Sequence, residues 1–159
     1  VVTSPVVHDW LSDRWQAASD MQGTPIKGPH WLEVDLCQPA VIRSVTIDWE
    51  GALATDYLIQ GKLHKEDEWT LMLDANKADV HQTQGPQPSK QGPKAHVTHR
   101  LQIPSEWSAG RRGCPDSTEA VRFVRLYINK PAKKWGASVW YWQLFGGFVQ
   151  GCEQSSSCS

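Results

Sequence analysis

The chain has 159 residues and a formal net charge of -1 at pH 7, and a chain of this length suits one domain that buries about 70% of its unfolded surface. The balanced charge argues against nucleic-acid binding, which favours a strongly basic face. No apolar run approaches the ~20 residues of a membrane span, and the first residues lack the charged and apolar regions of a signal peptide, so we expect a mature chain or an excised domain.

The first clear periodic signal is in residues 30–36, HWLEVDL. Leu32, Val34 and Leu36 alternate there with Glu33 and Asp35, which predicts a strand with one face exposed to water. The pair Gln38-Pro39 is expected to turn the chain. Residues 41–49 then alternate in the same way and predict a second strand.

Two more strands are predicted in residues 57–63 and 69–73, and the charged turn HKEDE joins them as a hairpin. Residues 74–96 are polar and rich in proline and glycine, which indicates a surface loop or an extended insertion. Alternation resumes in residues 97–103 and predicts a further strand. A second long loop follows it.

Residues 121–146 hold two apolar runs, VRFVRLYI and SVWYWQLF, separated by a Lys-rich connection. β-Branched and aromatic residues dominate both runs, and such residues fit the pleated surface of a sheet. The second run is apolar on both faces, which predicts a central strand, and Gly146-Gly147 is expected to end it. The basic connection between the runs is a candidate contact surface.

Seven or eight strands, regular turn signals and no convincing helix predict an all-β sandwich. We expect one domain over residues 1–150 and a C-terminal tail over residues 151–159, tethered if a disulfide holds it. Catalysis is not expected. The neighbouring carboxylates, Asp48 with Glu50 and those of residues 66–68, lie at a strand end and in a turn, where they seldom face each other across a cleft as in a glycosidase.

The four cysteines allow three full pairings. Cys152 and Cys158 flank a short polar run, and if they pair, Cys37 and Cys114 pair at long range. No Cys-x-x-Cys spacing occurs, which argues against a zinc site. Two disulfides in an extracellular domain is the preferred interpretation, and reduced thiols in a cytosolic protein is the alternative.

Several motifs, taken together and in order, resemble the coagulation-factor type C, or discoidin, domains, which are related to family-32 carbohydrate-binding modules. Ser12 to Trp15 stands where the family usually has Thr-Arg-Trp, and Cys37 stands where it usually has Gly. The matching segments are residues 12–15 (SDRW), 30–36 (HWLEVDL), 47–59 (IDWEGALATDYLI), 68–69 (EW), 122–126 (RFVRL) and 135–146 (WGASVWYWQLFG).

The resemblance implies a jelly-roll β-sandwich of two antiparallel sheets, with a galactose-binding-like fold and ligand-binding loops at one end. It implies a non-catalytic, extracellular or secreted module, or the ectodomain of a surface protein, that binds a glycan or glycoprotein or serves cell adhesion. The alternative is a module that binds an anionic phospholipid membrane or a protein partner. A sugar requires an aromatic face and a few fixed polar groups, whereas a membrane requires apolar tips ringed by Lys and Arg.

The candidate ligand-binding residues are loop aromatics, histidines and basic side chains. We expect the histidines to hydrogen-bond sugar hydroxyls, the loop tryptophans to offer stacking faces, and the basic side chains to form a patch. The alternatives are histidines satisfied within their loops, tryptophans packed under loops, and ordinary solvated charge. Strand tryptophans, namely Trp31, Trp49, Trp69 and Trp140, are expected in the core. The candidates are His8, Trp10, His30, Arg111, Arg112, Lys133, Lys134 and Trp135.

The resemblance also implies a structural calcium site in many members. Asp9 and Asp13 are the candidate ligands here, but Tyr141 stands where the family has a ligand Glu, which removes a hard anionic ligand that Ca²⁺ prefers. The equivalent of Arg14 is usually structural in the family, and we expect a packed ion pair for it.

Overall fold

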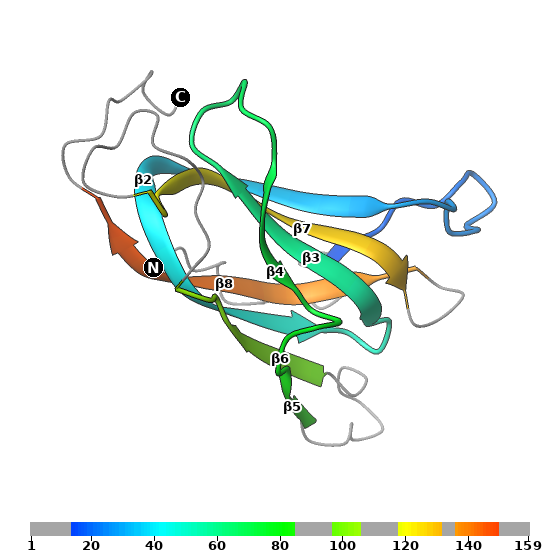
Figure 1. Cartoon of the computed structure of the whole chain (residues 1–159). Coiled ribbons are helices and arrows are strands. Elements are labelled where there is room, and N and C mark those ends of the chain that lie inside the picture. Colours follow the sequence, from blue (N-terminus) through cyan, green and yellow to red (C-terminus); the bar gives the residue numbers. More distant parts are fainter. Residues whose placement is uncertain (1–13, 85–96, 106–117, 132–135, 150–159) are drawn as a thin grey trace.

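The computed structural model describes residues 14–84, 97–105, 118–131 and 136–149. Within these ranges the chain forms eight strands, all paired antiparallel (Figure 1). None of these residues is helical, so they hold no helix that could cross a membrane. The strands are β1 (Trp15–Gln16), β2 (His30–Trp49), β3 (Ala54–Lys62), β4 (Thr70–Asp74), β5 (His81–Gln84), β6 (Val97–Gln102), β7 (Val121–Pro131) and β8 (Ser138–Phe148).

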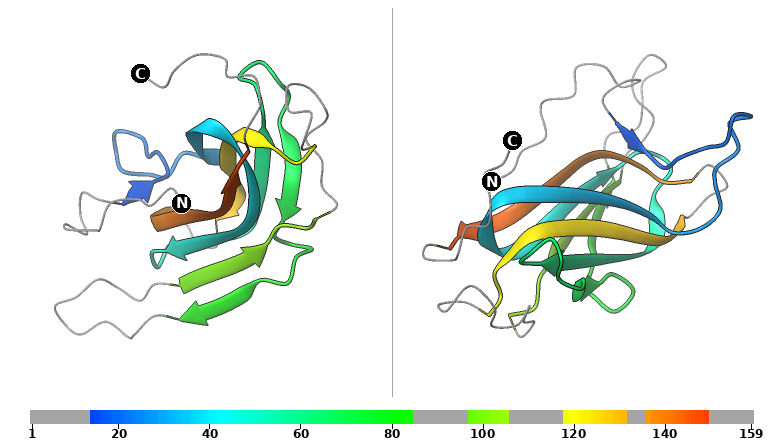
Figure 2. Two further views of the ribbon diagram at one scale, coloured as in Figure 1. Left: turned by 90° about the vertical axis from the view of Figure 1, so that its left-hand side faces the viewer. Right: turned by 90° about the horizontal axis from the view of Figure 1, so that it is seen from above.

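Strand β2 belongs to two layers. Its first half pairs with β7, and its second half pairs with β8 and β6. The front layer therefore has the order β2–β7–β3–β4, and the back layer has the order β1–β8–β2–β6–β5. Hydrogen bonding continues through β2, so a single antiparallel sheet curls over itself (Figure 2). The all-β class is confirmed, and in place of two separate sheets we find two layers that share a strand.

The bend of β2 lies at Cys37, where the sequence predicted a turn at Gln38-Pro39 between two strands. Cys37 has a φ of 64°, a left-handed conformation that favours glycine. Its backbone N–H donates to Asp35 Oδ1 at 2.8 Å. The register of β2 against β7 shifts between Asp35 and Ala40. The irregularity lets one strand pass from the front layer to the back layer without a loop.

Asp35 also holds the neighbouring strand at this corner. The Arg122 guanidinium on β7 donates to both Asp35 oxygens at 2.8 Å, a bidentate geometry that gives strong charge-assisted bonds. This hydrogen bonding lowers the pKa of Asp35 and raises the pKa of Arg122. Arg122 interrupts the apolar run VRFVRLYI, and the ion pair with Asp35 is the reason a charge is tolerated there.

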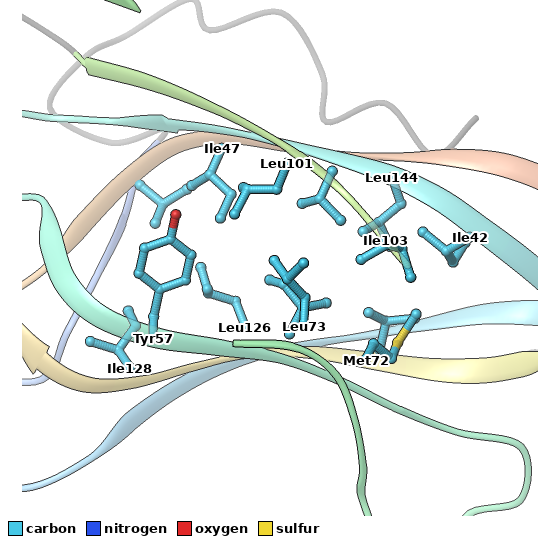
Figure 3. Packing of buried hydrophobic residues seen from close by; sticks show 14 of the residues in the cluster. Ile42, Ile47, Tyr57, Met72, Leu73, Leu101, Ile103, Leu126, Ile128 and Leu144 are labelled. Atoms are coloured by element: carbon cyan, nitrogen blue, oxygen red, sulfur yellow. The ribbon is translucent and has the colours of Figure 1, made fainter. Parts of the chain in front are cut away.

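The core lies between the two layers, where alternate side chains of β2, β3, β6, β7 and β8 meet (Figure 3). Its largest fully buried side chains are Trp49, Tyr57, Ile47, Ile59, Leu101, Leu126 and Ile128. The predicted central position of β8 is confirmed, because β8 has β1 on one side and β2 on the other.

Two predicted boundaries are wrong. Strand β8 does not end at Gly146-Gly147 but continues to Phe148. A Cβ at Gly146 would collide with the backbone carbonyl of Val41, so this glycine permits close strand approach instead of stopping the strand. The predicted loop over residues 74–96 contains β5, a short polar edge strand that pairs with β6. The predicted hairpin is confirmed as β3 and β4.

Cys37 is disulfide-bonded, and no described cysteine is free. Cys114, Cys152 and Cys158 lie outside the described residues, so the pairing of Cys37 with Cys114 stays a prediction. The predicted tail over residues 151–159 also lies outside them.

Candidate functional site

One end of the sandwich carries the start of β2, the end of β7 and the start of β8 (Figure 1). We call it the loop end. The segment that precedes β2 reaches it as a tight loop built on Asp20. The Asp20 carboxylate accepts hydrogen bonds from the backbone N–H of Gln22 at 3.0 Å and of Thr24 at 2.7 Å. Gly23, with a φ of 79°, supplies the left-handed residue of the turn. The loop is therefore fixed by its own side chain.

Contacts with β8 hold this loop against the sheet. The Ala17 N–H donates to the Ala137 carbonyl at 2.9 Å. Gly136 has a φ of 82°, and a Cβ built there would lie 3.5 Å from the Cβ of Ala17 and 3.6 Å from that of Pro25. The left-handed backbone at Gly136 thus brings the start of β8 close to the loop and closes one wall of the site.

A surface hollow of about 390 Å³ lies between these segments. It is lined by residues 24–28 and His30, by Asn129 and Pro131, and by Gly136. The lining is mixed, because two prolines and the half-exposed Ile26 lie beside hydroxyl, imidazole and amide groups and the ammonium of Lys27. Such a lining suits a small ligand with both apolar and hydrogen-bonding surfaces.

His30 is the polar group at the base of β2. Its Nε2 lies 2.9 Å from the Ile26 carbonyl oxygen. A carbonyl accepts, so Nε2 carries the proton and Nδ1 is left as an acceptor. The same bond ties the loop to the strand, so one side chain both shapes the hollow and offers an acceptor to a ligand.

Asn129 lines the opposite side of the hollow and is held by a polar cluster. Its Nδ2 donates to Asp56 Oδ1 at 3.0 Å, and Asn76 Nδ2 donates to the same oxygen at 2.9 Å. These two bonds hold the pKa of the Asp56 carboxyl below its usual value. Asn129 therefore presents its carbonyl oxygen outward, with an ionised carboxylate behind it.

A second hollow, of about 500 Å³, lies beside β5 and β6 and is lined in part by His81 and Arg100. It is larger, but no hydrogen bond or ion pair between described residues fixes either side chain. We take the loop-end hollow as the candidate site because its polar groups are fixed in place.

The structure describes one of the predicted ligand-binding residues. His30 lines the hollow, and His8, Trp10, Arg111, Arg112, Lys133, Lys134 and Trp135 lie outside the described residues. The last three belong to the four-residue connection between Pro131 and Gly136, which both line the hollow.

The calcium prediction is also untested, because Asp9 and Asp13 lie outside the described residues. No group of three His, Cys, Asp or Glu side chains suited to a metal ion occurs among the residues that are described. Arg14 forms the expected structural ion pair, with Glu50 at 3.8 Å, and both side chains are largely buried.

Of the four strand tryptophans expected in the core, Trp49 and Trp140 are buried there. Trp31 is 54% exposed, which contradicts the prediction. The alternation of β2 already grouped Trp31 with Glu33 on the wet face, but the general burial of tryptophan outweighed it. Trp69 is half-buried on the outer face of the front layer, where cations cover it.

That outer face carries a row of alternating aromatic and cationic side chains, which we call the cation–aromatic ladder: Phe123, Lys62, Trp69, Arg125 and Tyr127. The Lys62 ammonium lies 4.6 Å from the Trp69 ring centre and 5.7 Å from that of Phe123. The Arg125 guanidinium lies 4.3 Å from Trp69 and 4.9 Å from Tyr127. Each cation thus lies between two rings, a favourable arrangement.

No protein-family model and no curated protein sequence matches the chain. Solved structures that resemble it are chitosan-binding modules of a chitosanase/glucanase from Paenibacillus sp. IK-5. A selenomethionine-labelled mutant of module 1 has a TM-score of 0.52 at 17% identity, and the match covers 84% of this chain and 75% of the module. Module 2 in complex with chitotriose has a TM-score of 0.50 at 22% identity, and the match covers 84% of this chain and 77% of the module. At these identities the likeness shows a shared fold.

Proposed function

We propose that this chain is a non-catalytic glycan-binding module whose ligand docks in the loop-end hollow. The observation that carries the proposal is the hollow itself, with Asp20, His30 and Asn129 fixed by hydrogen bonds around it. The shared fold with modules that bind chitosan supports it. The discoidin family and the jelly-roll topology belong to the same proposal and rest on the sequence motifs.

The lining groups suit a sugar. Ile26 and Pro131 offer apolar contact to the C–H face of a pyranose ring, while His30 Nδ1 and the Asn129 carbonyl accept hydrogen bonds from its hydroxyls. Lys27 in the lining and the ionised carboxylate of Asp56 behind Asn129 place opposite charges at the hollow. Oligosaccharides of β-linked glucosamine are the first ligands to test, because modules with the same fold bind chitosan.

Recognition without bond cleavage fits the same lining. Hydrolysis of a glycoside requires two carboxyl groups on either side of the bond, about 5–9 Å apart. None of the described residues that line the hollow carries a carboxyl group.

Calorimetry with glucosamine oligosaccharides tests the proposal. We expect His30→Ala to weaken binding about five- to tenfold, since it removes an acceptor and the tie to Ile26. The matched control is His81→Ala, which removes an exposed histidine on β5 and is expected to leave binding unchanged. Failure of the wild-type chain to bind any glycan, or equal effects of the two variants, would overturn the proposal.

An extracellular or secreted location is part of the proposal. The disulfide at Cys37 supports it, because structural disulfides persist in oxidising compartments. Peptide mapping without reduction is expected to recover Cys37 joined to Cys114 and Cys152 joined to Cys158. Any other pairing rules out this framework.

An anionic membrane is the second candidate ligand, because Met21 is 98% exposed at the tip of the loop and Ile26 is 49% exposed beside Lys27. If the loop inserts, the chain sediments with phosphatidylserine vesicles, and Met21→Ser abolishes this. A wild-type chain that stays in the supernatant excludes membrane binding.

A further inference from the structure

Trp31 differs from the other tryptophans of the front layer. It projects from β2 on the outer face and is opposite Tyr127 of β7. Trp69 on the same face is covered by Lys62 and Arg125, whereas 54% of Trp31 is exposed. A single exposed apolar side chain is ordinary, so its significance depends on what lies beside it.

The loop-end hollow lies beside it. Asn129 lines the hollow. His30, the residue before Trp31, also lines it but is on the opposite face of β2, because it pairs with the buried Ile128. Asn129 follows Tyr127 by two residues on β7, which places both on the outer side of that strand, about 6.6 Å apart along it. The rim of the hollow therefore continues over Tyr127 to Trp31 without a break in the sheet.

Charged groups border Trp31 on the other side. Glu33 is the next outward side chain of β2 and is exposed, and it pairs in register with Arg125. Arg125 is not free to move, because its Nε donates to Gln60 at 2.7 Å and its guanidinium lies between two rings. An exposed indole thus has an exposed carboxylate two residues along the same strand, on the same face.

We propose that Trp31 is an accessory subsite for a β-linked glucosamine chain that extends out of the hollow. The proposal rests on the proposed function and deepens it. The indole face stacks on the C–H face of a sugar ring that lies outside the hollow. The Glu33 carboxylate binds the ammonium group of that sugar. This gives the module two carboxylates along the path of the chain, Asp56 behind Asn129 and Glu33 beside Trp31.

A glycan fits this surface better than a protein partner does. A stable protein interface covers about 800 Å² on each partner and has an apolar centre. Here the exposed apolar residues Trp31 and Leu71 lie on different strands, β2 and β4. The charged ladder separates them. A sugar chain requires only one ring face and the polar groups at its edge.

Chain length provides the test. Calorimetry compares glucosamine trimer with hexamer for the wild type, Trp31→Ala and Trp31→Phe. We expect Trp31→Ala to bind the hexamer about two- to tenfold more weakly, because it removes the contact between one sugar ring and the indole. The affinity for the trimer is expected to stay unchanged. Trp31→Phe keeps most of the hexamer affinity.

Phe148→Ala is the matched control, because Phe148 is also 54% exposed but lies at the other end of β8. It is expected to leave both affinities unchanged, and melting curves verify that each variant is folded. If Trp31→Ala alters neither affinity, or both equally, the subsite is refuted while trimer binding sensitive to His30→Ala upholds the proposed function. A wild-type chain that binds neither oligosaccharide refutes both.

Discussion

Among the described residues, aromatic and basic side chains meet both inside the sandwich and on its front face. Inside, His99 Nδ1 accepts hydrogen bonds from Trp49 Nε1 at 3.1 Å and from the Tyr57 hydroxyl at 2.8 Å. On the front face, Lys62 and Arg125 lie between the rings of the ladder. The buried group is a base with a lowered pKa, whereas Arg125 stays charged although burial lowers its pKa as well.

The difference follows from solvation. Burial lowers the pKa of His99, since a charged imidazole between the layers loses its hydration. With Nδ1 accepting, Nε2 carries the proton of the neutral ring, and it is buried with no hydrogen-bond partner among the described residues. A second proton would have to go to Nδ1, which already accepts from Trp49 and Tyr57. On the outer face water solvates the cations, and the rings add to that solvation. Similar residue types therefore specify the core in one place and cover a surface in the other.

The largest expected effect is a loss of stability when a tryptophan is replaced, and it is expected to differ between the two regions. Trp49→Ala empties a fully buried site and removes a donor to His99, so the free energy of unfolding falls by about 3–5 kcal/mol. Trp69→Ala removes two cation–ring contacts at the surface and costs under about 2 kcal/mol. Urea denaturation measures both. Equal losses would contradict the distinction between core and surface.

The pH dependence of stability tests the buried histidine. The pKa of His99 is lowered in the folded state, so below about pH 6.5 the unfolded chain binds a proton that the folded chain does not. The contribution of His99 to the free energy of unfolding is complete above about pH 6.5, its unfolded pKa. As the pH falls from there towards the folded pKa, this contribution is lost at up to about 1.4 kcal/mol per pH unit. His99→Asn retains an acceptor without a titration, and is expected to flatten this slope. A wild-type slope in His99→Asn would refute the assignment.

A smaller effect is expected at the bend that joins the layers. Cys37→Gly and Cys37→Ala both remove the disulfide, but only glycine is relaxed at a φ of 64°. We expect the glycine variant to be more stable than the alanine variant by about 1 kcal/mol, measured as a shift in denaturation midpoint. If alanine is as stable as glycine, the bend does not store strain.

The strands were largely predictable because an apolar alternation of period two is a local signal. The runs that became β2, β6 and β7 carry it, and the run that became β8 is recognised instead by apolar residues on both faces. The failures arise where a distant segment decides. Nothing near Gly146 in the sequence shows that the Val41 carbonyl approaches it, and polar β5 depends on its pairing with β6.

The candidate site was predictable only in part. His30 was selected by residue type, but its partner in shaping the hollow, Asn129, lies about a hundred residues away along the chain and had no signal of its own. Trp31 and Glu33 are on the same face of β2, and Leu32 between them is on the other, so the alternation predicts that Trp31 is exposed. The general preference of tryptophan for burial led to the opposite prediction. The local pattern therefore deserved more weight than the residue type here.

The smallest expected effect concerns the ladder. Arg125→Met keeps most of the packing against Trp69 and Tyr127 but removes the charge, so we expect a loss of about 1 kcal/mol in the free energy of unfolding. Arg100→Met, at an exposed arginine of β6, is the control and is expected to change stability by less than about 0.5 kcal/mol. A loss confined to Arg125→Met means that the ladder stabilises the fold and that its rings are occupied. Trp31, which no cation of the described residues covers, is then the aromatic surface of the front layer that remains for a ligand.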